Sequence, residues 1–298
     1  MREVSHLVMR SGAGSLQPVA RAPRLTAAVC DMLREIDIID EYGERRSIDV
    51  PAERPLTIFL DGRELVTLMT LGASPELLVL GYLHNQRLIG SAAEIDSIAV
   101  DWNSSAAAVK TREGWNPNAA AAARRLLTTG CGLGTAFADL QNQIDAIHLP
   151  ATDAARISQR SLYRLLEIMS QQESLHRNAG SVHGCALFRE AEMLVFVEDV
   201  SRHNAIDTIT GWMGLYGVRG DDKILYTTGR LSSEMVMKAG RMGVPVFVSR
   251  NGVTAMGLEV AHQLAMTLIG RAAKRRFLCY VGADRFDAEP EPRSEARD

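Results

Sequence analysis

The amino-acid sequence predicts an α/β protein whose carboxyl-terminal half forms a three-layer α/β/α domain, preceded by a smaller α+β domain. Three features support this prediction. In the second half, apolar runs alternate with amphipathic stretches, as expected for βαβ units around a sheet with parallel strands that is covered on both faces. In the first half, a hairpin pattern precedes a helix start. A glycine-rich segment at residues 128–134 separates the two halves.

The predicted amino-terminal α+β domain spans residues 23–127. Its clearest element is a β-hairpin, in which Asp61-Gly62 forms the turn between the apolar runs LTIFL and ELVTLMT. A helix is expected next, with Ser74 at the N-cap and Pro75 at the first helical position. Residues 1–22 mix Ser, Gly, Pro and Arg without periodicity, so they are predicted to form a disordered tail.

The predicted second domain spans residues 151–282 and follows a flexible cysteine loop and connector at residues 128–150. Its charged, proline-containing continuation at 283–298 is predicted to be a disordered tail. Ser232 is the expected N-cap of its second helix. Strands are expected at 193–198, 224–228, 246–249 and 277–281, with a shorter candidate at 267–270, and helices at about 204–217, 232–242 and 255–266.

The overall composition argues against several functions. The 298 residues are 46% hydrophobic, which is enough to fill a sizeable core. The formal charge of -3 combines 33 basic with 36 acidic residues, so no global field favours nucleic acid or an anionic membrane. No apolar run of about 18 residues and no signal peptide are evident, which predicts a cytoplasmic protein. The expected state of Cys30, Cys131, Cys185 and Cys279 is therefore the reduced thiol.

Cys131 lies between Gly130 and Gly132, in a segment with almost no side-chain cover. This setting would let the persulfide of another protein approach the sulfur closely, which favours a role in sulfur transfer. The reactive form is the thiolate, whose population depends on nearby positive charge. Two alternatives exist. Cys131 could be a small residue in a glycine-rich turn, or a zinc ligand, although Gly134 stands where a Cys-x-x-Cys pair would place its second thiol.

Polar residues follow three of the predicted strands, at the edge where α/β proteins place ligand sites. Arginine side chains, hydroxyl groups and helix amino termini there would suit a phosphate. The alternative is that these residues only cap helices and pair with carboxylates. The candidate binding residues are Arg202, His203, Gly229, Arg230, Ser232, Ser233, Ser249 and Arg250. A further candidate is the basic run Arg271, Lys274, Arg275 and Arg276, although a charge run taken alone is usually a solvated turn.

His183 invites comparison with the His-x-Glu motif of zinc deaminases. Cys185 stands where their catalytic glutamate would be, and no Cys-x-x-Cys follows, so zinc-dependent deamination is disfavoured. His183 is then a core histidine or a cofactor contact. Cys185 and Cys279 lie within apolar stretches and are predicted to be buried and inert.

The cysteine loop, with SVHGCALF (181–188), EDVSRHNAID (198–207), the block at 229–250 and TLIG (267–270), resembles the FdhD formate dehydrogenase accessory sulfurtransferases. The resemblance runs from about Arg45 to Gly282. It implies a cytidine-deaminase-like fold for the second domain and a persulfide on Cys131, received from a cysteine desulfurase.

The same resemblance implies that the sulfur passes to the molybdenum cofactor, Mo-bis(molybdopterin guanine dinucleotide), of a formate dehydrogenase catalytic subunit. The cofactor would be a bound substrate, the protein itself would bind no metal directly, and the chain would form a homodimer. The resemblance also favours a cofactor-binding role for the basic run.

The loop departs from the family pattern, which usually reads Cys-Gly-x-Cys-Gly. The matching residues here are Cys131-Gly132-Leu133-Gly134-Thr135, so only the first cysteine is present. A relay or disulfide through a second loop thiol is therefore not possible. The alternative function is a non-catalytic cofactor-binding chaperone or divergent paralog without productive sulfur transfer.

Overall fold

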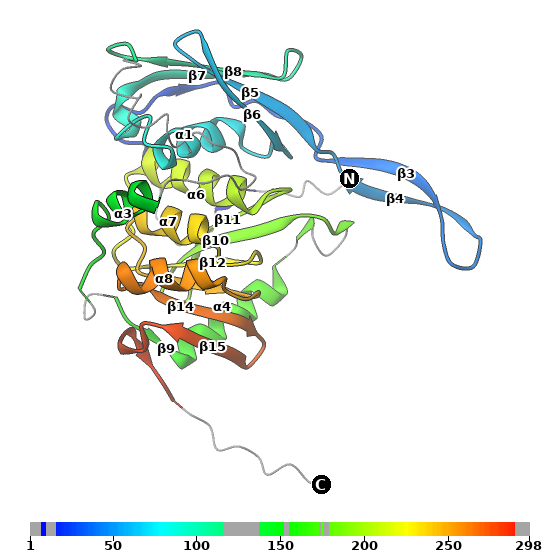
Figure 1. The fold of residues 1–298 in the computed structure, drawn as a ribbon. Helices are drawn as coiled ribbons and strands as arrows, with labels where there is room; N and C mark the ends of the chain where they lie inside the picture. The colour runs from blue at the N-terminus through cyan, green and yellow to red at the C-terminus, as the bar shows by residue number, and fades with distance from the viewer. Residues whose placement is uncertain are drawn as a thin grey trace.

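The computed structural model describes residues 7–9, 16–115, 137–151, 155–172, 174–175 and 179–289. Two large β-sheets, of seven and five strands, are stacked in layers with helices between and around them (Figure 1). The mixed α/β class predicted from the sequence is confirmed. In the described part of the chain, no helix combines the length and the apolar character that crossing a membrane requires.

The amino-terminal domain is a five-stranded sheet with one helix packed against it. The predicted hairpin is confirmed, because Asp61 and Gly62 form its turn with φ of 46° and 79°, the positive values that a tight two-residue hairpin turn needs. The predicted helix begins at Pro75, although the Ser74 side chain makes no capping hydrogen bond. The sheet order is β2 (Arg24–Leu25), β7 (Ile95–Asp101), β8 (Ala106–Thr111), β5 (Arg54–Leu60) and β6 (Arg63–Thr70), and the helix is α1 (Pro75–Asn85).

A two-stranded ribbon projects from this domain (Figure 1). It consists of β3 (Leu33–Ile39) and β4 (Arg45–Pro51), which pair only with each other in an antiparallel register. A short 3₁₀ helix, η1 (Ala92–Glu94), leads into β7 on the opposite side of the domain.

The second domain is built on a seven-stranded mixed sheet. Its strands, in spatial order, are β1 (Leu7–Met9), β11 (Glu192–Asp199), β10 (His183–Arg189), β12 (Lys223–Thr227), β13 (Val246–Ser249), β14 (Thr267–Ala273) and β15 (Arg276–Val281). All five predicted strands are present. The parallel part, however, is limited to β12, β13 and β14, and the other pairs are antiparallel. Two of these antiparallel pairs, β10–β11 and β14–β15, are joined by two-residue turns, which can link only antiparallel strands.

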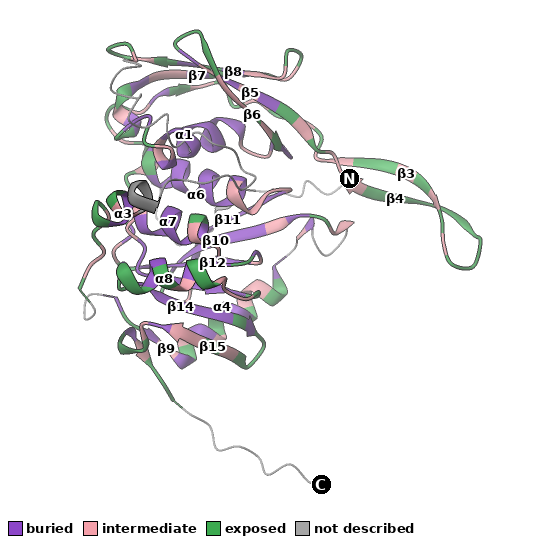
Figure 2. Ribbon diagram, viewed as in Figure 1, coloured by how far each residue is buried: buried purple, intermediate pink, exposed green. Residues whose placement is uncertain are grey.

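Helices cover both faces of this sheet, as predicted. The helices α6 (Arg202–Tyr216), α7 (Ser233–Arg241) and α8 (Ala255–Gln263) share one apolar core with α1 and one face of the sheet. The helix α4 (Gln159–Gln171) packs Leu162, Leu165 and Leu166 in a second core on the other face. Figure 2 shows this buried interior running through α1, α6 and the central strands. The helix α3 (Phe137–Asp145) lies at the side of α7 in Figure 1.

The folded body extends beyond both predicted tail boundaries. At the amino-terminal end, β1 pairs with β11, and Val19 N donates a hydrogen bond to Leu215 O. At the carboxyl-terminal end, η2 (Ala283–Arg285) is followed by β16 (Phe286–Asp287), which pairs with β9 (Ile157–Ser158). Arg285 is only 2% exposed. A polar composition predicted tails here, but a short strand needs only an open sheet edge and a few contacts.

The two domains meet where α1 crosses α6. The crossing is so close that a Cβ atom at Gly81 would lie 1.7 Å from Asp207 O, and one at Gly211 would lie 1.9 Å from Leu77 O. The helix backbones therefore touch at these two glycines. Any larger residue at either position would displace one of the helices.

Candidate functional site

The ends of the three parallel strands are tied together by hydrogen bonds. Ser249, at the end of β13, donates its hydroxyl to Gly229 O (2.6 Å) and accepts from Asn251 N (2.8 Å). Arg271 N then donates to Asn251 O (2.8 Å), which links the loop after β13 to β14. Ser249 is fully buried, so its hydroxyl serves to position the two loops. These bonds join the loop after β12 to the loop after β13, and the loop after β13 to β14.

The start of α6 lies against the loop that follows β12. Ser201 caps the helix by accepting a hydrogen bond from His203 N (3.2 Å). A Cβ atom on Gly229 would lie 2.8 Å from Arg202 Cδ, so the two residues are in direct contact. Burial, followed by the neighbouring charge of Arg230, lowers the pKa of Arg202. The Nε atom of Arg202 is buried and has no hydrogen-bond partner, which is unusual for a guanidinium group.

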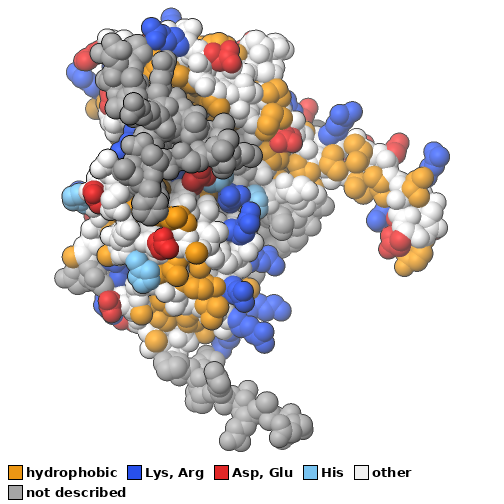
Figure 3. Space-filling model, viewed as in Figure 1, with side chains coloured by type: hydrophobic (Ala, Val, Ile, Leu, Met, Phe, Trp, Pro, Cys, Tyr) orange, Lys and Arg blue, Asp and Glu red, His pale blue; other side chains and the backbone are white. Residues whose placement is uncertain are grey.

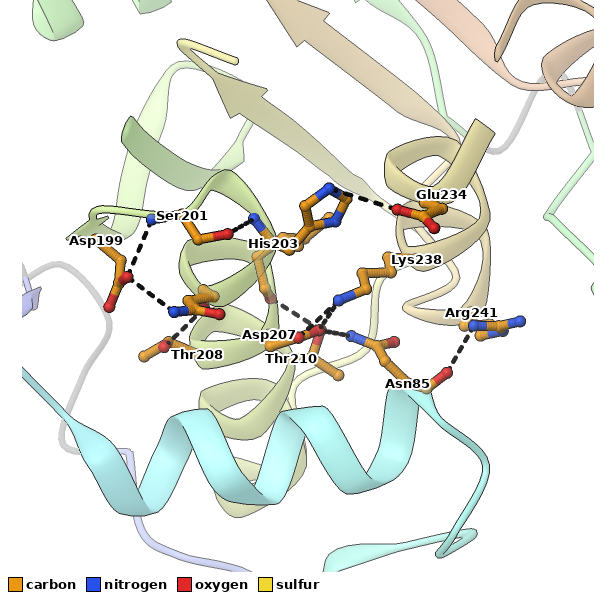
Figure 4. Close-up of polar contacts among 12 residues, drawn as sticks. Asn85, Asp199, Ser201, His203, Asp207, Thr208, Thr210, Glu234, Lys238 and Arg241 are labelled. Atoms are coloured by element: carbon orange, nitrogen blue, oxygen red, sulfur yellow. Dashed lines mark hydrogen bonds and ion pairs between the residues drawn. The ribbon is translucent and has the colours of Figure 1, made fainter. Parts of the chain in front are cut away.

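His203 is a neutral imidazole at this position. Its side chain is 20% exposed, and its Nε2 lies 3.5 Å from Glu234 Oε2 (Figure 4). Burial, together with the charges of Lys238, Arg202 and His183, lowers the pKa of His203 to about 3. It can therefore exchange hydrogen bonds with a ligand near neutral pH but does not add a positive charge.

Ser232 and Ser233 stand at the amino terminus of α7. Ser232 occupies the N-cap position, but its side chain makes no capping hydrogen bond, so the predicted cap is wrong in this respect. Its hydroxyl oxygen is buried without a partner. Leaving a buried hydroxyl unpaired costs about 1–3 kcal/mol. Arg202 Nε, this hydroxyl and the amino terminus of α7 are hydrogen-bond donors of the kind that bind an anion such as a phosphate.

The remaining candidate cations are exposed side chains on the strand-end loops and along the β14–β15 hairpin. Arg230 and Arg250 follow β12 and β13, and Arg271 adjoins the loop after β13. The β14–β15 hairpin extends past the last residues of the neighbouring strands and carries Lys274, Arg275 and Arg276. The Arg275 guanidinium lies 5.7 Å from the centre of the Tyr163 ring. Figure 3 shows Lys and Arg side chains gathered down one side of the visible face, below the projecting ribbon.

A buried charged network beneath the site was not predicted from the sequence. Lys238 Nζ, on α7, lies 2.7 and 2.6 Å from the two carboxylate oxygens of Asp207, on α6. Asn85, at the end of α1, donates its side-chain amide to Asp207 Oδ1 at 2.7 Å (Figure 4). Because breaking a buried ion pair leaves an uncompensated charge, the network fixes α6 and α7 relative to each other. The sequence feature that could have indicated this network is a charged residue at a buried, otherwise apolar position of each helix, Asp207 in α6 and Lys238 in α7.

Cys131, the predicted persulfide carrier, lies outside the described residues. Among the cysteines that the structure describes, Cys185 is fully buried, and burial raises its pKa to about 12. Burial also raises the pKa of Cys30 and of the half-buried Cys279. All three are therefore thiols near neutral pH and poor nucleophiles. His183 opens β10, opposite Asp199, and is half-buried.

The described residues contain no group of three or more His, Cys, Asp and Glu side chains close enough to hold a metal ion. Within that part of the chain, the site is instead a set of arginines, hydroxyls and a helix terminus, which is the chemistry of an anion site.

Comparison with known proteins gives a consistent result. The sequence profile of the FdhD/NarQ family matches residues 51–287. A Listeria innocua protein named sulfur carrier protein FdhD is 29% identical over 248 residues, which cover 83% of this chain and 95% of that protein. A Bacillus licheniformis protein of the same name is 30% identical over 234 residues, covering 78% and 88%. A crystal structure of a candidate formate dehydrogenase accessory protein from Desulfotalea psychrophila has the same fold, with a TM-score of 0.68, 24% identity, and coverage of 85% and 98%.

Proposed function

Because this chain belongs to the FdhD/NarQ family, we propose that it is a sulfurtransferase that carries sulfur on Cys131 and delivers it to the molybdenum cofactor of a formate dehydrogenase. The observation that carries the proposal is the extent of the family match, which includes Cys131 and every candidate binding residue. Relatives named sulfur carrier proteins support the carrier role. The proposed partners are a cysteine desulfurase, a formate dehydrogenase catalytic subunit and a second copy of the chain, in the cytoplasm, where thiols stay reduced.

The proposed chemistry consists of two balanced transfers at Cys131. In the first, its thiolate attacks the outer sulfur of a desulfurase persulfide, the donor S–S bond breaks, and the desulfurase thiolate leaves. In the second, the terminal sulfur of the new persulfide bonds to tetravalent molybdenum, the S–S bond breaks, and Cys131 leaves as a thiolate. The metal supplies the two electrons that reduce the transferred sulfur to sulfide. No second thiol is required in either step, so the chemistry is compatible with Gly134 in the second cysteine position.

The proposed substrate, Mo-bis(molybdopterin guanine dinucleotide), carries several phosphate groups. The unpaired Arg202 Nε and Ser232 Oγ, with the amino terminus of α7, support binding of one phosphate. The exposed arginines Arg230 and Arg250 and the basic β14–β15 hairpin could neutralise others. Ser249 contributes indirectly by holding the loops together.

Persulfide formation is the direct test of the carrier role. Incubation of the protein with a cysteine desulfurase and cysteine is expected to add about 32 Da to the peptide that contains Cys131, as measured by mass spectrometry. Reduction with a thiol should remove the added mass. Cys30, Cys185 and Cys279 should remain unmodified, since burial keeps them protonated. Absence of the adduct under conditions that load another sulfur carrier would refute the role of Cys131.

Guanosine diphosphate, as a fragment of the cofactor, tests the proposed binding residues. Replacing Arg230 or Arg275 with alanine is expected to weaken its binding by about 1.5–3 kcal/mol if each makes a charged hydrogen bond, as measured by calorimetry. The affinity should also fall as salt rises. Arg219→Ala is the control, because Arg219 is exposed, forms an ion pair with Asp221, and precedes β12, whereas Arg230 follows that strand. Unchanged affinity in both test variants would place the site elsewhere.

A chaperone without sulfur transfer is the second candidate function, and the single loop cysteine favours it. A carrier with two thiols could release sulfur by forming a disulfide, and Gly134 excludes this route here. The two functions differ in the measurements above. A chaperone would bind guanosine diphosphate but would not acquire the added mass on Cys131.

A further inference from the structure

A cavity of about 390 Å³ lies between the carboxyl-terminal ends of α1, α3 and α7, away from the strand-end loops. Its wall includes His84 and Arg87 at the end of α1, His148 after α3, and Arg241 in the last turn of α7. The candidate anion site borders the opposite, amino-terminal end of α7. The volume falls in the range of small-molecule sites. No carboxylate lines the cavity in the part of the chain that the structure describes.

Arg87 occupies a position where glycine is normally preferred. The helix α1 ends in a Schellman motif, in which Leu88 N donates to Leu83 O and Arg87 has a left-handed φ of 57°. The helix α7 ends at the same cavity in the same motif, but there the left-handed residue is Gly243. A residue with a Cβ atom is sterically strained in this conformation, whereas glycine is not. Strain of this kind is commonly kept where the side chain has a function.

Helix capping explains only some of the basic groups at this cavity. Arg241 donates to Asn85 O (2.6 Å, Figure 4) and to Gln143 Oε1 (2.5 Å), and Arg87 donates once to Gln143 O (3.3 Å). Arg241 Nε and His84 Nδ1 are buried without a partner.

The nearby carboxylates of Glu94 and Asp207 do not form ion pairs with Arg87 or Arg241. Glu94 accepts hydrogen bonds from Gly90 N and Ser91 N, and Asp207 is paired with Lys238. Burial, followed by the charge of Arg87, lowers the pKa of Arg241 to about 10. Among the described residues, no carboxylate therefore lies within ion-pair distance of Arg87 or Arg241, and the charge of the more distant Asp207 only partly offsets that of Arg241.

We propose that this cavity binds the phosphate group of a small metabolite, held by Arg87 and Arg241 with His84 and His148 as additional hydrogen-bonding groups. Arg87 has guanidinium nitrogens that capping does not use, and His84, which lines the cavity, has a buried Nδ1 without a hydrogen-bond partner. The volume exceeds that of one phosphate, so a phosphate ester fits as well as the free ion. This site is independent of the proposed sulfur transfer.

The test follows the ring resonances of the histidines by NMR while the full chain is titrated with inorganic phosphate or with adenosine monophosphate. We expect the His84 and His148 signals to shift with both probes. Tighter binding of adenosine monophosphate would identify a phosphate ester as the ligand, and equal binding would identify free phosphate. The His203 signal reports separately on the strand-end site. If neither His84 nor His148 responds at millimolar concentrations, the proposal is wrong.

Arg87→Gly separates binding from stability. This variant relieves the left-handed strain, so its melting temperature should be unchanged or higher, while its affinity for the probes should fall about tenfold or more. Ala265→Gly is the matched control. Ala265 occupies the same motif at the end of α8, with a φ of 50°, but does not line the cavity. It should gain the same stability and keep the affinity. Equal affinities in the two variants would overturn the proposal.

Discussion

Replacing Cys131 with serine is expected to abolish the ability of this protein to activate a formate dehydrogenase. A serine hydroxyl cannot hold sulfane sulfur, so no persulfide would reach the molybdenum cofactor. The other thiols cannot substitute, because burial raises the pKa of Cys30, Cys185 and Cys279 and keeps them protonated. The measurement is formate dehydrogenase activity in cells whose own sulfur carrier has been deleted and replaced by the variant.

The control for this experiment is Cys279→Ser. Cys279 is half-buried, and its thiol donates only a weak hydrogen bond to Val281 O (3.5 Å), so its loss should leave sulfur delivery intact. Thermal unfolding of Cys131→Ser should match the unmodified protein, which would show that the lost activity reflects chemistry. Full activity in Cys131→Ser would refute the persulfide mechanism and favour the chaperone function.

Elements with strong local signals were predicted well. The turn at Asp61-Gly62 fixed the β5–β6 hairpin, since these residues adopt positive φ readily. The basic run at Lys274-Arg275 was given two interpretations, a solvated turn or a binding cluster, and the structure places these residues in the two-residue turn between β14 and β15. The proportion of parallel strands was overestimated. Pairing between strands depends on which segments meet in space, and the local pattern does not contain that information.

In the candidate site, too, the local features could be predicted from the sequence and the long-range contacts could not. The positions of Arg202, Arg230 and Ser232 at strand ends and helix starts followed from the order of elements along the chain. The buried hydrogen bonds did not, because they join segments far apart in sequence. Asp207 is bonded to Asn85, 122 residues away, and Ser249 is committed to Gly229. The Ser249 hydroxyl, which was predicted to bind a ligand, is thus used in hydrogen bonds within the protein. The Ser232 hydroxyl, which was predicted to cap a helix, has no hydrogen-bond partner.

Gly211→Ala is expected to lower the free energy of unfolding by about 3–5 kcal/mol, the range of severe core defects. The added Cβ would lie 1.9 Å from Leu77 O and 3.0 Å from Gly81 N, and both are backbone atoms that cannot rotate away. Helix α1 would have to move from α6, which would open the interface between the domains and strain the bond from Asn85 to Asp207. The measurement is chemical denaturation followed by circular dichroism.

Gly214→Ala, one turn further along the same helix, separates packing from helix propensity. There the added Cβ would meet only Ala92 Cβ, at an ordinary contact distance of 3.9 Å. Alanine favours a helix over glycine by up to about 1 kcal/mol, so this variant should be slightly more stable. The same propensity gain applies at Gly211, so the difference between the two variants measures the clash at the crossing. If Gly211→Ala is as stable as Gly214→Ala, then α1 and α6 are not in backbone contact, and the domains are joined by other means.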